Sequence, residues 1–326
     1  MTTPSFVTDL QLYGPRGLQP EPLSLARSRR YCRLLASRHY ENFTVASWLL
    51  PWGLRQHFCN VYAYCRWADD LADEVADPEQ RLALLAWWEK QLRLCYEGQP
   101  HHPVFVALED TIATFDIPIE PFVDLLVAFR QDQEITRYET FGQLVNYCRY
   151  SANPVGQMVL YLAECHDAHR VRLSDSVCTG LQLANFCQDV ARDWDRGRIY
   201  LPEVDRLRHH YDEAMFARRE CNTDFRRLLK ASVTEAEGWL RRGLPLVELL
   251  PSAFQLSVTL FIEGGLAILE SIRRRDYDVW TSRPTLSKWQ KLRLIASCWW
   301  RLWRGTLMDR YAKDPLPSDE DADAAE

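Results

Sequence analysis

Apolar residues recur at intervals of three and four along most of this chain, and short turn signals separate the windows that they mark. The turn signals include DIPIEP (116–121) and DRGRIYLPE (195–203). Alternating strand patterns of useful length are missing, as are Asn-Gly or Asp-Gly turns between apolar runs. The pattern therefore predicts an almost entirely α-helical protein, folded as an all-α bundle.

No linker divides the 326 residues, since the chain has no glycine-serine tract, proline-rich spacer or repeat. Apolar residues make up 47% of the chain, enough for a sizeable core. We predict one domain over residues 25–310, preceded by an N-terminal extension, 1–24. The acidic end of the chain, 311–326, has few large apolar groups and is predicted to be disordered.

Charge and cysteine content narrow the class of protein. With 39 basic and 45 acidic residues the net charge is −6, so nucleic acid is not an expected partner. The ten cysteines form no C-x-x-C pair, and the start of the chain lacks the apolar core of a signal peptide. These features predict a cytoplasmic protein with reduced thiols. No stretch reaches the roughly 18 uninterrupted apolar residues of a membrane span, so the chain is expected to be soluble or to lie on a membrane surface.

The segment YCRWADDLADE (64–74) concentrates acidic side chains on one predicted helix. Six polar residues in and just before it fall on adjoining helix faces: Tyr62, Arg66, Asp69, Asp70, Asp73 and Glu74. Like charges three and four positions apart destabilise an isolated helix, so a cation is expected to compensate them. For a single acidic pair, a solvated helix face is the usual explanation.

A second acidic segment, GLQLANFCQDVARDWDRGRIYLP (180–202), strengthens the case for a site. Four polar residues separated by three, four and four positions form one stripe along a helix: Gln182, Asn185, Asp189 and Asp193. The opposite side carries Leu183, Phe186 and Val190. Polar groups on a largely buried helix are costly unless they face a ligand or a wet cavity.

If the two helices face one another, their carboxylates converge on one space. Hard divalent cations prefer oxygen ligands, and Mg²⁺ commonly bridges a few carboxylates to phosphate oxygens. The sequence therefore predicts Mg²⁺ as cofactor, with Mn²⁺ as the alternative ion. Arg66, Arg192 and Arg198 would add charge-assisted contacts to the phosphate.

These segments resemble the aspartate-rich motifs of the squalene and phytoene synthase family, the head-to-head prenyl synthases. YAYCRWADDLADE resembles the first motif and QLANFCQDVARDWDRGRIYLP the second. YCRYSANPVGQMV (147–159) and LESIRRRDYDVWTSRPTLSKWQK (269–291) add support, and the resemblance covers roughly residues 25 to 295. It implies a single-domain helical bundle of the isoprenoid-synthase type with a central active-site cavity.

The resemblance also implies a role for each matching residue. Metal ligands would be Asp69, Asp73, Asp189 and Asp193, supported by Asp70 and Glu74. Diphosphate contacts would come from Arg66, Gln182, Asn185 and Arg198. Tyr62, Tyr147 and Tyr200 would line the place where charge develops, with Tyr147 counted among the catalytic residues. His39, Asn42 and Phe43 match a substrate-contacting H-x-x-x-F segment.

Within the family, three features resemble the hydroxysqualene synthase branch of bacterial hopanoid pathways (HpnC type): RHYENFTVASWLLP (38–51), SANPVG (151–156) and Gln188 immediately before the second motif's first aspartate. By this resemblance, most relatives carry arginine at that position. The resemblance implies Mg²⁺-dependent ionisation of presqualene diphosphate, rearrangement of the cation and capture by water, without NADPH. An alternative is a presqualene diphosphate, squalene or phytoene synthase that condenses two prenyl diphosphates. A non-catalytic helical assembly or binding protein with the same fold ranks lower, because it predicts eroded aspartates.

The segment LSKWQKLRLIASCWWRLWRG (286–305) predicts an amphipathic helix. One face carries Trp289, Leu292, Ala296, Trp299 and Trp303, and basic residues lie elsewhere. Two interpretations stay open: residues 286–310 contact a membrane interface, or the helix packs on the bundle. The first would place the protein peripherally on the inner face of the cytoplasmic membrane. The expected partners are a prenyl diphosphate and, as a further hypothesis, other hopanoid-pathway enzymes.

Overall fold

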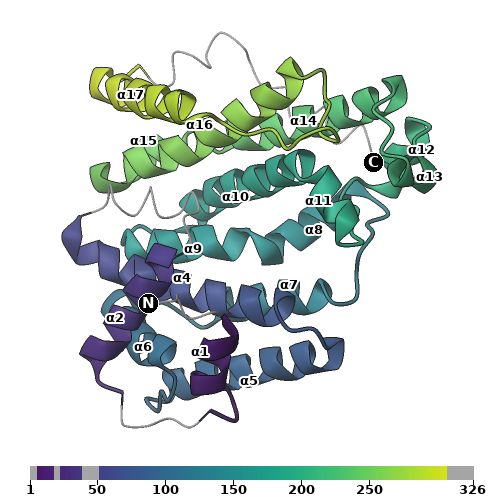
Figure 1. Cartoon of the computed structure of the whole chain (residues 1–326). Helices are drawn as coiled ribbons and strands as arrows, with labels where there is room; N and C mark the ends of the chain where they lie inside the picture. The colour runs from purple at the N-terminus through teal and green to yellow at the C-terminus, as the bar shows by residue number, and fades with distance from the viewer. Residues whose placement is uncertain (1–5, 18–22, 39–50, 307–326) are drawn as a thin grey trace. The chain divides into compact units, whose positions relative to one another are not determined.

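The structure is a computed structural model that describes residues 6–17, 23–38 and 51–306. Within these ranges the chain is helical, and β-pairing is confined to an isolated bridge between Arg137 and Ile199 (Figure 1). The all-α prediction is therefore confirmed for the described part of the chain. Two compact units emerge, one formed by residues 1–135 with 158–164 and the other by 136–157 with 165–326. The predicted boundaries at residues 24 and 310 stay predictions.

The first unit is built from helices α1 to α7. They are α1 (Phe6–Tyr13), α2 (Leu25–Arg38), α4 (Trp52–Asp73), α5 (Pro78–Tyr96), α6 (Pro103–Phe115) and α7 (Glu120–Gln131), joined by the end of α9 (Asn153–Leu162). Local chemistry sets several of these boundaries. Asp77 caps α5 by accepting from the backbone N–H of Glu79, and Pro78 occupies the first helical position, where no N–H is needed.

Stacked aromatic rings form the core of the first unit around α4. Trp67 stacks on Trp88 with ring centroids 5.2 Å apart and 11° between the planes, and Trp88 packs on Phe105 at 4.4 Å. Tyr64, fully buried, donates its hydroxyl to the carbonyl of Phe122 at 2.8 Å. Because these large rings come from four helices, they fix α4 against α5, α6 and α7.

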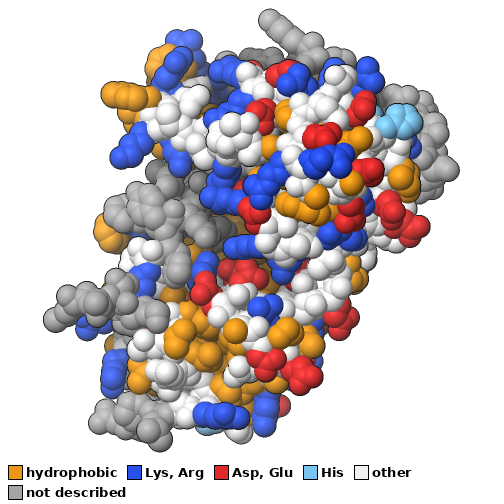
Figure 2. Space-filling model, turned by 45° about the vertical axis from the view of Figure 1, so that its right-hand side comes forward, with side chains coloured by type: hydrophobic (Ala, Val, Ile, Leu, Met, Phe, Trp, Pro, Cys, Tyr) orange, Lys and Arg blue, Asp and Glu red, His pale blue; other side chains and the backbone are white. Residues whose placement is uncertain are grey.

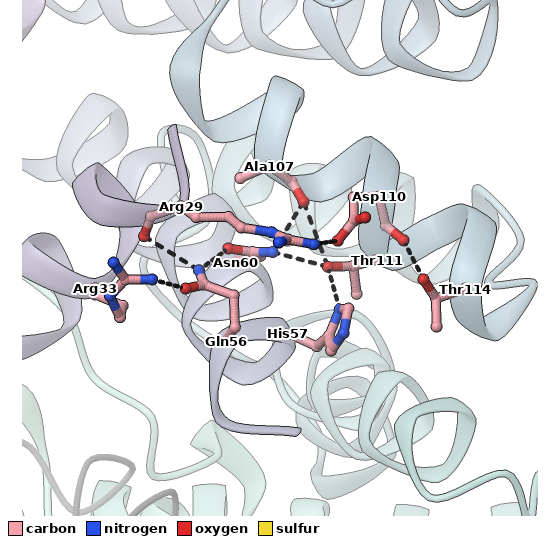
Figure 3. A network of polar contacts seen from close by, with 9 residues as sticks. All are labelled: Arg29, Arg33, Gln56, His57, Asn60, Ala107, Asp110, Thr111 and Thr114. Atoms are coloured by element: carbon pink, nitrogen blue, oxygen red, sulfur yellow. Dashed lines mark hydrogen bonds and ion pairs between the residues drawn. The ribbon is translucent and has the colours of Figure 1, made fainter. Parts of the chain in front are cut away.

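A polar network joins α4 to α2 and α6 (Figure 3). Asn60, fully buried on α4, donates to the carbonyl of Ala107 at 2.8 Å and to the Thr111 hydroxyl at 2.9 Å. Gln56 in turn donates to Asn60 at 2.7 Å and to the carbonyl of Arg29 at 3.1 Å. A buried amide with satisfied hydrogen bonds tolerates little rotation of its helix. The network therefore sets the rotation of α4, and with it the direction of the acidic residues further along that helix.

The second unit is built around α10. Its elements are the start of α9, α8 (Phe141–Ser151), α10 (Ala168–Gln188), α11 (Val190–Asp195), α12 (Glu203–Arg208), α13 (Glu213–Ala217), α14 (Thr223–Arg242), α15 (Leu246–Leu249), α16 (Ser252–Arg274) and α17 (Lys288–Arg304). The closest packing brings α10 onto α14 at Gly180, where an added Cβ would lie 2.7 Å from the backbone nitrogen of Leu240. Glycine is thus required there for the two backbones to approach.

Helix α16 is the one described helix that is long and apolar enough to cross a bilayer. It nevertheless packs against α10, α14, α15 and α17 within the second unit. Its buried Glu263 forms an ion pair with Arg301 of α17 at 3.1 Å. A central helix of a folded bundle has the same length and composition as a span, so α16 is weak evidence for a membrane protein.

Candidate active site

The first acidic motif (residues 62–74) lies on the last three turns of α4 and its C-terminal cap. Its apolar members Leu71 and Ala72 are buried, and so is Val61 just before it. Asp70 is buried with them, Asp69 is 44% exposed along its side chain, and Asp73 and Glu74 are exposed. The motif thus runs from the core to the surface.

Arg66 supplies the compensating cation that the like charges require. Its guanidinium forms ion pairs with Asp69 at 3.1 Å and with Asp70, one turn further along α4. Burial raises the pKa of the Asp70 carboxyl to about 6 even though the Arg66 guanidinium opposes the shift, and the charges of Glu74 and Asp73 add to it. The first motif therefore holds more negative charge than Arg66 neutralises, a setting that attracts a further cation.

The second acidic motif (residues 182–200) spans a break between two helices. Helix α10 ends at Gln188, α11 begins at Val190, and Asp189 between them has φ −102° and ψ 13°. The helical hydrogen bonds continue across the break, since Asp189 N–H donates to Asn185 at 2.8 Å and Asp193 N–H to Asp189 at 2.9 Å. Two consecutive helices thus carry the predicted polar stripe, and its spacing of three and four is kept.

Burial follows the predicted two sides of this segment. Leu183, Phe186 and Val190 are buried, while Asn185 is exposed and Gln182 is half-buried. The motif ends where Arg198 turns back on it, its backbone N–H donating to the Asp193 carbonyl at 2.8 Å.

Arg283, from a distant part of the chain, forms hydrogen bonds with Asp189. Arg283 donates from Nε to Oδ1 at 2.5 Å and from Nη2 to Oδ2 at 2.7 Å, and Nη2 also donates to the Gln188 side chain at 3.0 Å. Gln188 then donates to the carbonyl of Pro284 at 2.5 Å. Both side chains of the pair Gln188–Asp189 are thus tied to the segment before α17.

The carboxyl of Asp193 has a raised pKa. Burial, helped by the neighbouring charge of Asp189 and opposed by Arg198, raises the pKa of its carboxyl to about 7. A partly buried carboxyl whose charge is disfavoured, beside a second acid, forms a natural binding position for a cation.

An aromatic cluster adjoins the second motif. Tyr200 stacks on Phe186 with ring centroids 3.9 Å apart and 9° between the planes, and Tyr147 stacks on Tyr200 at 5.9 Å. Tyr138 completes the cluster at 5.8 Å from Tyr200. The structure thus brings together Tyr147 and Tyr200, two of the three tyrosines that the resemblance assigns to one place.

Two residues near the second motif were not predicted from the sequence. Three predicted residues lie in a part of the chain that the structure does not describe. Arg283 and Tyr138 were missed because they are linked to the motif by tertiary packing and carry no spacing signal of their own. His39, Asn42 and Phe43 lie outside the described residues. Tyr62 is half-buried on α4. That the two acidic motifs share one pocket stays a prediction.

A model of the family described as squalene/phytoene synthase matches residues 36–290, well over half of the chain. The protein is a member of the squalene/phytoene synthase family. The predicted resemblance is thereby confirmed. Members of this family are synthases that use prenyl diphosphates.

Characterised synthases of the family match over most of their length. A phytoene synthase from Arthrospira platensis is 29% identical over 284 residues, covering 83% of this chain and 92% of the relative. A chloroplastic phytoene synthase from Daucus carota is 30% identical over 268 residues, covering 80% of this chain and 67% of its own.

Solved structures place the fold in the same family. The squalene synthase HpnC from Alicyclobacillus acidocaldarius is 42% identical, with a TM-score of 0.75 over 79% of this chain and 97% of its own. A dehydrosqualene synthase in complex with a ligand is 27% identical, with a TM-score of 0.79 over 86% and 98%. The predicted isoprenoid-synthase fold is therefore confirmed, and the resemblance to the HpnC type is supported.

Squalene/phytoene synthases use a divalent metal, and the donor chemistry of both motifs fits one. Carboxylate oxygens are the ligands that Mg²⁺ prefers. Burial raises the pKa values of Asp70 and Asp193, so their charged forms lack solvation that a bound cation would replace. Among the described residues, no group of three or more His, Cys, Asp or Glu is arranged to hold an ion. Water and diphosphate oxygens would have to complete the shell, as is usual for Mg²⁺.

Proposed function

We propose that this family member is a hydroxysqualene synthase. It would convert presqualene diphosphate and water into hydroxysqualene and diphosphate. The observation that carries the proposal is the 42% identity to the squalene synthase HpnC over 97% of that chain, well above the 27–30% identity to the phytoene synthases that match. The glutamine at position 188, an arginine in most relatives by the resemblance described above, supports the same branch.

In this proposal the two acidic motifs hold Mg²⁺ and the substrate's diphosphate between them. The ligands would be Asp69, Asp73, Asp189 and Asp193, with Asp70 and Glu74 in support. When bound, Mg²⁺ neutralises the negative charge that develops on diphosphate as the carbon–oxygen bond breaks. Mn²⁺ is the alternative ion.

Arginine and amide side chains would hold the diphosphate. Arg198 follows the second motif directly, and Arg66 lies among the acids of the first, so each can donate charge-assisted hydrogen bonds to phosphate oxygens. Gln182 and Asn185, half-buried and exposed on α10, would donate amide hydrogens to the same anion. His39, Asn42 and Phe43 remain proposed substrate contacts.

The aromatic residues would shelter the carbocation. When the bond breaks, diphosphate leaves with the electron pair and carbon becomes cationic. Aromatic faces stabilise such a cation by roughly 0.5 to 2 kcal/mol per ring. Tyr147 and Tyr200 belong to a packed cluster and Tyr62 is half-buried, so they would also keep bulk water away. A single water then adds through its oxygen and loses a proton. The rearranged cation takes no hydride, so NADPH is not required.

Product analysis tests this proposal against its rivals. Purified protein is incubated with Mg²⁺ and presqualene diphosphate without NADPH, and the extract is analysed by mass spectrometry. The proposal expects an alcohol that carries oxygen-18 when the reaction is run in labelled water. Parallel reactions with farnesyl diphosphate and geranylgeranyl diphosphate test for presqualene diphosphate, squalene or phytoene synthase activity. A hydrocarbon as main product would contradict the proposal, and no turnover of any substrate would favour the non-catalytic alternative.

A further inference from the structure

Helix α17 has two different apolar faces. The inner face packs on α16 and includes Cys298, which is fully buried, with Leu294, Ile295 and Leu302 beside it in partly buried positions. The outer face carries large side chains that stand out from the protein: Trp289 75% exposed, Leu292 56%, Trp299 55%, Trp300 46% and Trp303 69%. On a helix these five fall on one stripe opposite the packed face. Packing on the bundle therefore leaves the tryptophan stripe (Trp289, Leu292, Trp299, Trp300 and Trp303) largely exposed within the described part of the chain.

The helix is held in place before anything contacts this stripe. Ser287 and Gln290 form a capping box at its start, and Gly305, with φ 66°, ends it in the left-handed conformation. Arg301 anchors the inner face through its ion pair with the buried Glu263. A surface that is already ordered loses little conformational entropy when it binds.

Basic side chains border the stripe on both sides. Arg293 and Arg304 lie along one edge, Lys288 lies along the other, and α17 contains no acidic residue. Arg304 also covers the Trp300 ring at 4.4 Å from its centroid. Figure 2 shows hydrophobic and basic side chains side by side on the upper part of the molecule. The protein as a whole carries a charge of −6, so this concentration of positive charge is local.

We propose that α17 docks on the surface of a membrane that contains anionic lipids, with the tryptophan stripe in the headgroup region. Tryptophan favours that region because its ring is apolar and its indole N–H is polar. The flanking Lys288, Arg293 and Arg304 lie where they meet lipid phosphates as the stripe enters. An apolar protein partner would explain the exposed rings but gives no role to cations on both edges. A lipid surface accounts for both, and it would accept the apolar product of a prenyl synthase.

Vesicle flotation tests the proposal with the full-length protein. The vesicles consist of phosphatidylcholine alone or of phosphatidylcholine with phosphatidylglycerol. We expect flotation with the anionic vesicles, little with the neutral ones, and a loss of binding as salt rises. The double variant Trp289→Ser/Trp303→Ser should lose most of the binding. Trp52→Ser is the matched control, because Trp52 is 83% exposed and lies on α4 in the first unit.

A charge variant separates the electrostatic part of the interaction. Lys288→Gln/Arg293→Gln should weaken flotation several-fold with anionic vesicles, whereas Arg208→Gln/Arg227→Gln, also exposed cations of the second unit, should not. Thermal unfolding of each variant checks that the fold is kept. Equal flotation of the wild type and the tryptophan variant would overturn the proposal. So would a wild type that never floats but forms a dimer in ultracentrifugation that Trp289→Ser/Trp303→Ser dissociates.

Discussion

Arg283 grips the carboxylate of Asp189 through two hydrogen bonds, from Nε to Oδ1 at 2.5 Å and from Nη2 to Oδ2 at 2.7 Å. The paired geometry of a guanidinium and a carboxylate gives strong, directional contacts. Arg283 therefore neutralises one acid of the second motif from within the protein. A metal ion that takes Asp189 as a ligand has to compete with this arginine.

Removing Arg283 should destabilise the metal-free protein. Arg283→Ala leaves the partly buried Asp189 and Gln188 without these hydrogen bonds, and we expect a loss of about 1–3 kcal/mol in the free energy of unfolding. Urea denaturation measures it. Arg192→Ala is the control, since Arg192 is 65% exposed and 3.8 Å from Asp189, and it should change stability by less than about 0.5 kcal/mol. Equal effects of the two variants would contradict a specific role for Arg283.

Neutralising a proposed metal ligand should stop diphosphate release without unfolding the protein. Asp69→Asn and Asp189→Asn keep side-chain shape but remove the charge that holds the cation, so we expect turnover to fall by roughly 100-fold or more. Released diphosphate is measured by a coupled assay and the fold by circular dichroism. Asp195→Asn, an exposed acid at the end of α11, should keep normal turnover. Full turnover by both test variants would rule out the metal assignment.

Asp193 should make the metal-free protein less stable as pH rises. Its pKa is raised to about 7 in the folded state, mainly by burial, so the folded protein binds this proton more tightly than the unfolded chain does. The stabilisation is present at low pH and is lost as pH rises from about 4 towards 7, by at most about 1.4 kcal/mol per pH unit.

The variant Asp193→Asn tests this pH dependence. It removes the titrating group, so its stability should fall less steeply than that of the wild type between these pH values. Chemical denaturation at a series of pH values, with a chelator present, gives both curves, and Asp195→Asn serves as the control. Parallel curves for the wild type and Asp193→Asn would show that the Asp193 carboxyl ionises without penalty.

The buried Asn60 should be a strong determinant of stability in the first unit. Asn60→Ala removes three hydrogen bonds, the two that Asn60 donates to Ala107 and Thr111 and the one that it accepts from Gln56, and leaves buried polar groups without partners (Figure 3). We expect a cost of about 2–3 kcal/mol, measured by thermal or urea unfolding. Thr114→Ala, an exposed hydroxyl next to the network, should cost less than about 0.5 kcal/mol. A small effect at Asn60 would mean that the aromatic core alone fixes α4.

Local periodicity made much of the fold predictable. Helical spacing alone assigned the buried side of the second motif, because residues three and four apart share a face whatever the helix packs against. The buried positions of Leu183, Phe186 and Val190 confirm that reasoning. The family was recognisable because two motifs retain their residue types at fixed spacing, and the candidate site residues follow from it as predictions.

Tertiary relationships could not be predicted in the same way. No sequence pattern connects Arg283 with Asp189, because their meeting depends on how α16 and its following segment pack near α10. The break at Asp189 is also absent from the pattern, since the spacing of the stripe continues through it. For α17 the sequence left two interpretations open, packing on the bundle and contact with a membrane. In the structure the inner face of α17 packs on α16, while its outer face stays exposed.

The tie between Gln188, Asp189 and residues 283–284 spans 94 to 96 positions of the chain. The ribosome therefore synthesises Asp189 of the second motif 94 residues before it synthesises Arg283, which neutralises that carboxylate. Closing so long a segment is slow compared with forming a helix. Until then the nascent chain carries two neighbouring carboxylates that lack this arginine, and a truncated translation product that ends before residue 283 would keep them in that state.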